Sequence, residues 1–179
     1  MKPMLVILTA YPGAGKTTIS RYMQTLGFAR VGTDDYRRML FDQEYPDIIA
    51  GQDAERKEGA VFSMLNGDKI ELLANNWDVI VDSTASTHEL RRYLLDTRTR
   101  RGEIPADKYV MHIMTRDEEL IARGRGDAIE TWNKSWQEPS SLLYGCPVLR
   151  YYNNTPCERQ DAFGDISERF KRKLWVPSH

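Results

Sequence analysis

The sequence has few cysteines, no long apolar run and no excess of charge of either sign. Cys146 and Cys157 are the only cysteines in 179 residues, and without a CxxC pair or a histidine cluster they predict neither a zinc site nor a disulfide scaffold. No apolar run approaches the ~20 residues that a membrane span needs, and residues 1–3 lead straight into a predicted strand, without room for a signal peptide. We therefore expect a cytoplasmic protein without membrane contact, whose cysteines are free thiols; a bridge between them is the alternative.

The charge balance is close to neutral. Lysine and arginine number 25 against 26 aspartate and glutamate, which gives a formal net charge of −1. This excludes a uniformly basic coat for nucleic acid but not a local basic groove. A length of 179 residues with 41% hydrophobic residues is typical of one folded unit. We expect a single domain over residues 1–179 and make no prediction of its oligomeric state.

A glycine-rich turn stands between an apolar run and a helical pattern. Residues 4–8 are apolar, residues 9–18 read TAYPGAGKTT, and apolar residues at positions 19, 23 and 26 then share one helix face. Strand, glycine-rich turn and helix in this order are typical of a phosphate-binding loop, whose backbone N–H groups and helix dipole hold an anion. The residues expected to bind the nucleotide are Gly13, Ala14, Gly15, Lys16, Thr17 and Thr18.

Two side chains of this loop carry specific chemistry. We expect Lys16 to reach the β- and γ-phosphates of ATP or another nucleoside triphosphate, and the Thr17 hydroxyl to ligate Mg²⁺. The pattern departs from the usual one at Ala10, where glycine is common, but a small residue still permits the tight turn. The alternative, an ordinary glycine-rich turn, leaves the agreement of the flanking strand and helix with the motif unexplained.

Predicted strands and helices alternate along the whole chain. The strands are expected at residues 4–8, 28–31, 78–82, 108–114 and 148–152. The helices are expected at residues 16–26, 34–40, 54–75, 86–101, 115–122, 127–137 and 161–175. Capping boxes at 86–89 and 115–118 would open two of them. Such alternation predicts an α/β fold, with one parallel sheet of about five strands and helices on both faces.

Three carboxylates follow predicted strands, where open α/β sheets place their ligands. Asp82 ends the third strand as a Walker B acid does and would hold Mg²⁺; alternatively, it caps the next turn. Asp34 and Asp35 follow the second strand, and a carboxylate there can accept the proton of an attacking hydroxyl or cap the next helix. The residues alone leave the choice between Asp34 and Asp35 open.

Arginines and glycines alternate after the fourth strand. Arg123 and Arg125 stand in an Arg-Gly-Arg-Gly run between two predicted helices. In a phosphoryl-transfer enzyme this indicates a lid, here about residues 116–138, that closes cations over the γ-phosphate; in isolation it is also compatible with a solvated turn. Nearby, we expect His112 to be a satisfied core residue, and Trp132 and Trp136, four residues apart, to pack rather than to stack a base.

The chain resembles the kinase domain of the phage-type polynucleotide 5′-hydroxyl kinases, within the P-loop kinases related to adenylate kinase. The resemblance covers roughly residues 1–130. It rests on PGAGKTT at 12–18, DDYR at 34–37, RKEG at 56–59, VIVDS at 79–83, ELRR at 89–92 and ELIAR at 119–123, in the family's order.

The resemblance implies a role for each matching residue. Asp34 would be the general base for the acceptor hydroxyl, Arg37 would grip a phosphate of the acceptor strand, and Ser83 would sit near that phosphate beside Asp82. Arg123 and Arg125 would be the lid arginines, although the lid is about two residues shorter than the family pattern. No phosphatase or ligase domain is appended, so healing of nucleic-acid 5′-OH ends would need a separate partner. Residues 139–179 have no counterpart.

Three functions are compatible with these patterns. The first is an ATP- and Mg²⁺-dependent polynucleotide 5′-hydroxyl kinase. The second is a kinase of the same fold that acts on a small molecule, a nucleoside or a hydroxymethylated DNA base. The third is a non-catalytic nucleotide-binding switch module, which is disfavoured because no Asn-Lys-x-Asp guanine-reading motif occurs. Arg37, beside Asp34, favours the first.

Overall fold

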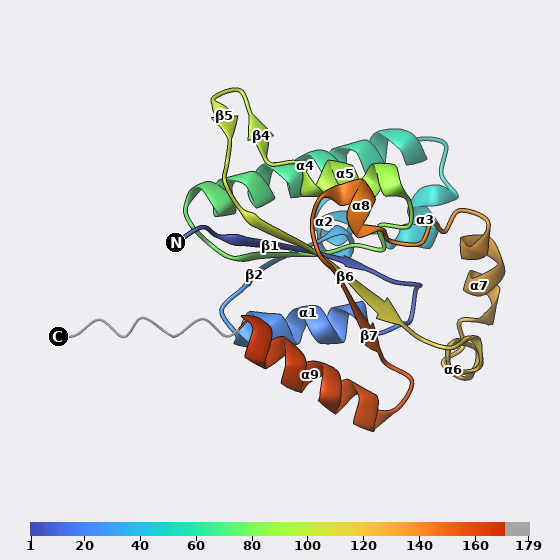
Figure 1. The fold of residues 1–179 in the computed structure, drawn as a ribbon. Helices are drawn as coiled ribbons and strands as arrows, with labels where there is room; N and C mark the ends of the chain where they lie inside the picture. The colour runs from blue at the N-terminus through green and yellow to red at the C-terminus, as the bar shows by residue number, and fades with distance from the viewer. Residues whose placement is uncertain (171–179) are drawn as a thin grey trace.

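The computed structural model describes residues 1–170, excepting the side chains of residues 127, 128 and 131. Within these residues the centre is a sheet of five parallel strands in the order β2-β3-β1-β6-β7 (Figure 1). The strands are β1 (Met4–Thr9), β2 (Ala29–Gly32), β3 (Val79–Asp82), β6 (Asp107–Met114) and β7 (Val148–Tyr152). The predicted parallel α/β sheet is confirmed.

Helices cover both faces of this sheet (Figure 1). One layer contains α1 (Lys16–Thr25) and α9 (Pro156–Phe170), and the other contains α2 (Thr33–Phe41), α4 (Ala54–Ala74) and α5 (His88–Leu95). The central strand β1 is buried throughout and serves both layers, because successive side chains point to opposite faces. Val6 and Leu8 join one apolar cluster, and Leu5 and Ile7 join the other.

The register of the sheet brings the carboxyl ends of its strands to one edge. Thr9 lies beside His112, Gly32 beside Asp82, and Met114 beside Tyr152. Segments that follow strands far apart in the sequence therefore meet at this edge. It is the edge at which open α/β sheets bind their ligands.

Short elements complete the described part of the chain. They are α3 (Tyr45–Ile49), β4 (Arg98–Thr99), β5 (Gly102–Glu103), α6 (Asp117–Ala122), α7 (Gly126–Asn133) and α8 (Ser141–Tyr144). The β4–β5 hairpin projects from the layer of α4 and α5, whereas α6 and α7 stand beyond the carboxyl end of β6 (Figure 1). Helices α6 and α7 thus occupy the region predicted to form the lid.

The predicted helix over 86–101 is wrong in its second half. Helix α5 ends at Leu95, and residues 98–103 form the β4–β5 hairpin. The cause is a tertiary contact with α4. The fully buried Lys69 of α4 donates hydrogen bonds from Nζ to the carbonyl oxygens of Leu94 and Asp96, both at 2.8 Å. These bonds satisfy the carbonyl groups at the end of α5, so the helix stops there. Arg98 binds the Asp96 carboxylate at 2.6 Å instead of continuing the helix.

Other boundaries differ by less. Thr87, rather than Ser86, caps α5 by accepting a hydrogen bond from the Leu90 N–H, and the Thr115 side chain caps no helix. Helix α7 ends at Asn133 instead of 137, and α9 begins at Pro156 instead of 161; its predicted extension over 171–175 lies outside the described residues. Both cysteines are free thiols, as expected. Through residue 170, no helix is long and apolar enough to cross a bilayer.

Candidate functional site

The phosphate loop has the backbone that its glycines were expected to supply. Gly13 and Gly15 adopt φ angles of +81° and +95°, in the left-handed region that favours glycine, and Gly15 is the N-cap of α1. Ala10 is absent from the positive-φ positions of the described chain and is fully buried against the sheet. Alanine therefore replaces glycine at that position without backbone strain.

Lys16 lies inside the loop. Its Nζ is 3.3 Å from the carbonyl oxygen of Tyr11 and 3.5 Å from that of Ala10. Burial lowers the pKa of Lys16, while the nearby carboxylates of Asp82 and Asp34 partly oppose that shift. The loop lysine is thus electrostatically coupled to two of the predicted site acids.

Asn153 supports the loop from the end of β7. Its Nδ2 donates a 2.6 Å hydrogen bond to the Ala14 carbonyl, and its Oδ1 accepts one of 2.9 Å from Arg159. A Cβ atom on Gly15 would lie only 2.2 Å from Asn153 Nδ2, so glycine is also needed here for close approach. The sequence interpretation did not include Asn153, although its position directly after a strand was an available signal.

Both lid arginines lie against the phosphate loop. Arg123 donates from Nη1 to the Gly13 carbonyl at 3.2 Å and from Nη2 to the Asn153 carbonyl at 2.7 Å. The Arg125 side chain passes over Gly13, because a Cβ there would be 2.6 Å from Arg125 Cγ. The structure therefore brings both guanidinium-bearing side chains to the end of the site where Lys16 lies.

Asp82 and Asp35 share one arginine, Arg30 of β2. Asp82 Oδ2 accepts hydrogen bonds from Arg30 Nη2 at 2.7 Å and from Ser20 Oγ at 2.8 Å, and Arg30 Nη1 binds Asp35 Oδ2 at 2.5 Å. Hydrogen bonds and the charges of Asp82 and Asp35 raise the pKa of Arg30, although burial, the largest single effect, acts against them. Arg30 was absent from the sequence interpretation, and no motif marks it.

The donor set near the loop is compatible with Mg²⁺. Thr17 is exposed at the start of α1, and Asp82 accepts hydrogen bonds from Ser20 and Arg30 on Oδ2. No group of three or more His, Cys, Asp or Glu residues able to hold a metal occurs within the described chain. Mg²⁺ at phosphate sites needs few protein ligands, since it is held by one or two protein oxygens together with phosphates and water. Thr17 and Asp82 fit that requirement.

The site has two walls. The phosphate loop forms one, and Asp34 and Arg37 of α2 form the other. Arg37 Nη1 is 2.6 Å from Asp34 Oδ1, and Arg37 Nε and Nη2 bind the two carboxylate oxygens of Glu58 at 2.8 and 2.7 Å. Arg37 is buried, whereas the Asp34 side chain is 65% exposed. The two aspartates thus separate: Asp35 binds Arg30, and Asp34 lies with Arg37. Glu58 of α4 was not given a role from the sequence.

Ser83 directly follows Asp82 and is buried in a turn with an unusual backbone conformation. Ala85, two residues later, has a φ angle of +43°, which is costly for a residue with a side chain. The Thr9 hydroxyl donates to the Ala85 carbonyl at 2.9 Å, and Arg91 donates to the Ser86 carbonyl at 3.0 Å. These contacts hold the Ser83 turn next to the phosphate loop.

Aromatic side chains connect the lid region to both walls. Trp136 stacks on Tyr11 of the phosphate loop with centroids 4.7 Å apart, and His112 lies 5.3 Å from the same ring. His112 is buried as predicted, but among the described residues its Nδ1 has no hydrogen-bond partner; Glu138 is 3.4 Å away. Burial lowers the pKa of His112 to about 4. Trp132 makes a different contact, with Tyr45 of α3.

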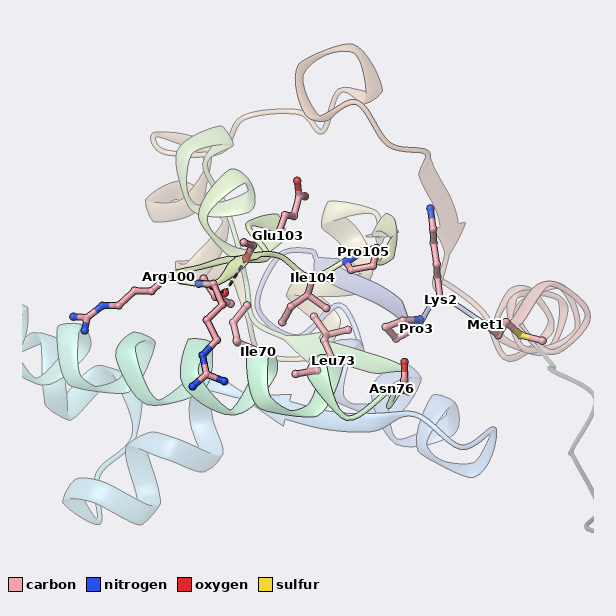
Figure 2. Close-up of a pocket in the computed structure, with 14 residues that line it drawn as sticks. Met1, Lys2, Pro3, Ile70, Leu73, Asn76, Arg100, Glu103, Ile104 and Pro105 are labelled. Carbon is pink, nitrogen blue, oxygen red and sulfur yellow. Dashed lines mark hydrogen bonds between the residues drawn. The ribbon is translucent and has the colours of Figure 1, made fainter.

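A cavity of about 900 Å³ lies at the opposite end of the sheet (Figure 2). It is enclosed by the chain's first three residues, the end of α4 and the β4–β5 hairpin. Ile70, Leu73, Ile104 and Pro105 provide apolar walls, and Arg100 stands at the rim (Figure 2). Because β1 runs from this cavity to the phosphate loop, the cavity is separate from the site that contains Lys16.

A phosphate loop at the carboxyl end of the first strand of a parallel sheet, contacted by Arg123 and Arg125, is typical of the P-loop kinase fold. The family model AAA_33, described as an AAA domain, matches residues 5–125, so the chain belongs to this family. A UPF0200 protein of Thermococcus gammatolerans is 27% identical over 152 residues, which cover 75% of this chain and 76% of that protein.

Solved structures share the fold. A chain of the Pnkp1/Rnl/Hen1 complex is 30% identical with a TM-score of 0.55, over 68% of this chain and 38% of its own length. A sugar kinase from Janibacter sp. HTCC2649 has a TM-score of 0.62 at 15% identity, over 95% of this chain and 99% of its own. The chain therefore shares its fold with a component of this complex and with a sugar kinase.

Proposed function

We propose that this protein is a polynucleotide 5′-hydroxyl kinase that transfers the γ-phosphate of ATP to a 5′-OH end of DNA or RNA. The observation that carries the proposal is the Asp34–Arg37 pair, 2.6 Å apart, across the site from Lys16. A carboxylate that accepts a hydroxyl proton and a guanidinium that binds a neighbouring phosphate are the two groups that such an acceptor requires.

Each residue of the site has a part in the proposed reaction. The 5′-hydroxyl oxygen of the acceptor attacks the γ-phosphorus of ATP. Asp34 accepts the proton that this hydroxyl loses. Lys16 and the lid arginines stabilise the charge that develops on the transferred phosphoryl group. Thr17 and Asp82 would hold Mg²⁺, and the bound ion would neutralise charge on the β- and γ-phosphates.

Similarity supports the choice of acceptor. The solved structures with 30% and 25% identity to this chain belong to the Pnkp1/Rnl/Hen1 assembly, which is described as an RNA repair complex. The chain spans only 38% and 42% of those proteins. In our proposal the present chain provides the kinase step, and a separate phosphatase or ligase completes end healing.

A small-molecule kinase is the second candidate. Arg37 already donates to Glu58 and Asp34, so its fork has fewer free donors for an acceptor phosphate than an unpaired arginine has. The sugar kinase and a gluconokinase from Sinorhizobium meliloti also share the fold over nearly the whole chain. A switch module without catalysis has less support, since the site contains a carboxylate and lid arginines that nucleotide binding alone does not require.

The test compares a nucleoside with its 3′-phosphate as acceptors of label from γ-labelled ATP. The 3′-phosphate is expected to have the higher kcat/KM, and Arg37→Lys to reduce the ratio of the two values, because lysine lacks the planar fork. Arg21→Ala, an exposed arginine on α1, is the matched control and should preserve the ratio. Equal kcat/KM for the two acceptors would contradict the polynucleotide assignment and favour the small-molecule kinase.

A further inference from the structure

Two aromatic side chains meet across the acceptor side of the site. Tyr45 begins α3, and its ring centroid is 4.7 Å from Cζ of the Arg37 guanidinium. Trp132 lies in α7 of the lid region, with its ring centroid 6.3 Å from that of Tyr45 and the two planes inclined by 36°. The pair joins the wall that contains Arg37 to the lid.

The position of the Tyr45 ring is determined by tertiary contacts. Ile48, in the same short helix, is fully buried and anchors α3. Arg37 is bound in its own plane by Glu58 and Asp34, at 2.6 to 2.8 Å, and a guanidinium held in this way can stack on an aromatic face while keeping its hydrogen bonds. Tyr45 is therefore oriented by the same arginine that the proposed acceptor site uses.

Both rings keep accessible surface, unlike the aromatic residues of the core. Tyr45 and Trp132 are each half-buried, whereas Phe170 is 1% exposed. A third ring placed between two others needs about 7 Å between their centres, which is two van der Waals spacings of about 3.5 Å. The observed 6.3 Å falls short of this by less than about 1 Å, so a flat group enters if α7 moves by about that distance and the two rings, now inclined by 36°, become parallel.

We propose that Tyr45 and Trp132 form the stacking site for the terminal nucleobase of the acceptor. This inference rests on the proposed function and adds a requirement to it: the acceptor carries a planar base beside its reactive hydroxyl. Stacking tolerates any sequence, since every base has a π face. A base held between α3 and α7 would also draw the lid region toward the wall that contains Asp34.

The experiment compares two acceptors that differ only in the base. One is a 2′-deoxynucleoside 3′-phosphate, and the other is 1,2-dideoxyribose 3-phosphate, which keeps the 5′-hydroxyl and the phosphate. The wild-type protein should prefer the first by roughly 5- to 150-fold in kcat/KM, the range expected for stacking of one base. The ratio is measured within each protein, so a general loss of activity cancels.

Four variants decide the role of the pair. Trp132→Leu and Tyr45→Leu should bring the ratio close to one, and Trp132→Phe, which keeps a ring, should restore most of it. Trp77→Leu, an exposed tryptophan beyond the end of α4, is the control and should leave the ratio unchanged. Thermal unfolding of each variant shows whether it is folded.

The outcomes separate this inference from the proposed function. If neither acceptor is labelled, the polynucleotide assignment is wrong, and the stacking site is wrong with it. If both are labelled equally well by the wild-type protein, the kinase assignment stands and the stacking site is wrong. A folded Trp132→Leu protein that keeps the full ratio would also overturn the inference, since the tryptophan would then only pack.

Discussion

The two sides of the site are built in different ways. The phosphate loop, the predicted nucleotide side, comes from one continuous segment, residues 9–18, and its distinctive feature is the positive-φ backbone at Gly13 and Gly15. The proposed acceptor side is assembled from side chains on three helices: Asp34 and Arg37 on α2, Glu58 on α4, and Tyr45 on α3. Backbone geometry is shared by a whole fold, whereas a set of side chains is particular to one protein. If the proposed function is correct, the acceptor side therefore determines which molecule is phosphorylated.

The supporting contacts differ in the same way. Behind the nucleotide side, Asn153 and Arg123 bind carbonyl groups of the loop. On the proposed acceptor side, Arg37 instead binds the carboxylates of Asp34 and Glu58 and lies over the ring of Tyr45. Changes on the nucleotide side should affect all acceptors equally, and changes on the acceptor side should discriminate among them. The first three predictions below test this difference, and the fourth tests the effect of burying His112 on stability.

The largest effect is expected from Asp34→Asn. Removal of the proposed base should lower kcat by about 10²- to 10⁴-fold, with the KM for ATP little changed, because an amide cannot accept the hydroxyl proton. Steady-state kinetics with a 5′-OH oligonucleotide measure both constants. Asp35→Asn is the matched control, since Asp35 faces Arg30. A larger loss in Asp35→Asn than in Asp34→Asn would exchange the roles of the two residues.

Lys16→Ala should have the next largest effect, with every acceptor alike. Loss of one preorganised cation at the transferred phosphoryl group lowers kcat by about 10²- to 10³-fold. Circular dichroism should show an intact fold, and Lys134→Ala, an exposed lysine on the lid side, should keep full activity. Near wild-type turnover in Lys16→Ala would refute the phosphate-loop assignment.

Asn153→Ala should weaken nucleotide binding without changing the choice of acceptor. It leaves the Ala14 carbonyl without the hydrogen bond from Asn153, which corresponds to ~1–3 kcal/mol, or roughly 5- to 150-fold in Kd for ATP. Calorimetric titration measures the Kd, with Asn75→Ala at the exposed end of α4 as the control. If ATP affinity is unchanged and only the KM for the acceptor rises, the assignment of Asn153 to the nucleotide side is wrong.

His112 should give the smallest effect, on stability below neutral pH. Its pKa is lowered by burial to about 4 in the fold, against about 6.5 in an unfolded chain. The unfolded state therefore binds more protons between these values, so the free energy of unfolding falls as the pH drops.

From pH 7 to pH 5 the loss should be about 1–2 kcal/mol. The groups that act on the ring electrostatically are Glu138, Arg91 and Arg150, and their balance does not offset burial. Urea unfolding at several pH values measures the slope, and His112→Gln should flatten it. An equal slope in that variant would show that other groups cause the acid sensitivity.

The sequence by itself determined the sheet, the phosphate loop and the positions of Asp34 and Asp82 at strand ends. These features depend on local patterns: an apolar run, glycines at left-handed positions, and side chains that follow a strand directly. The partners of these residues were not accessible in this way. Arg30 joins Asp35 to Asp82, and Asn153 meets Ala14, across 139 residues of chain.

Only the tertiary structure decided how the side chains are distributed between the two walls. Asp34 and Asp35 are adjacent in the sequence, and α2 turns one toward Arg37 and the other toward Arg30. The sequence also placed Trp132 and Trp136 on one helix, whereas α7 ends at Asn133 and the two rings contact opposite sides of the site. Periodicity along a helix specifies which residues lie on the same face. Which partner packs against that face depends on contacts between elements that are far apart in the chain.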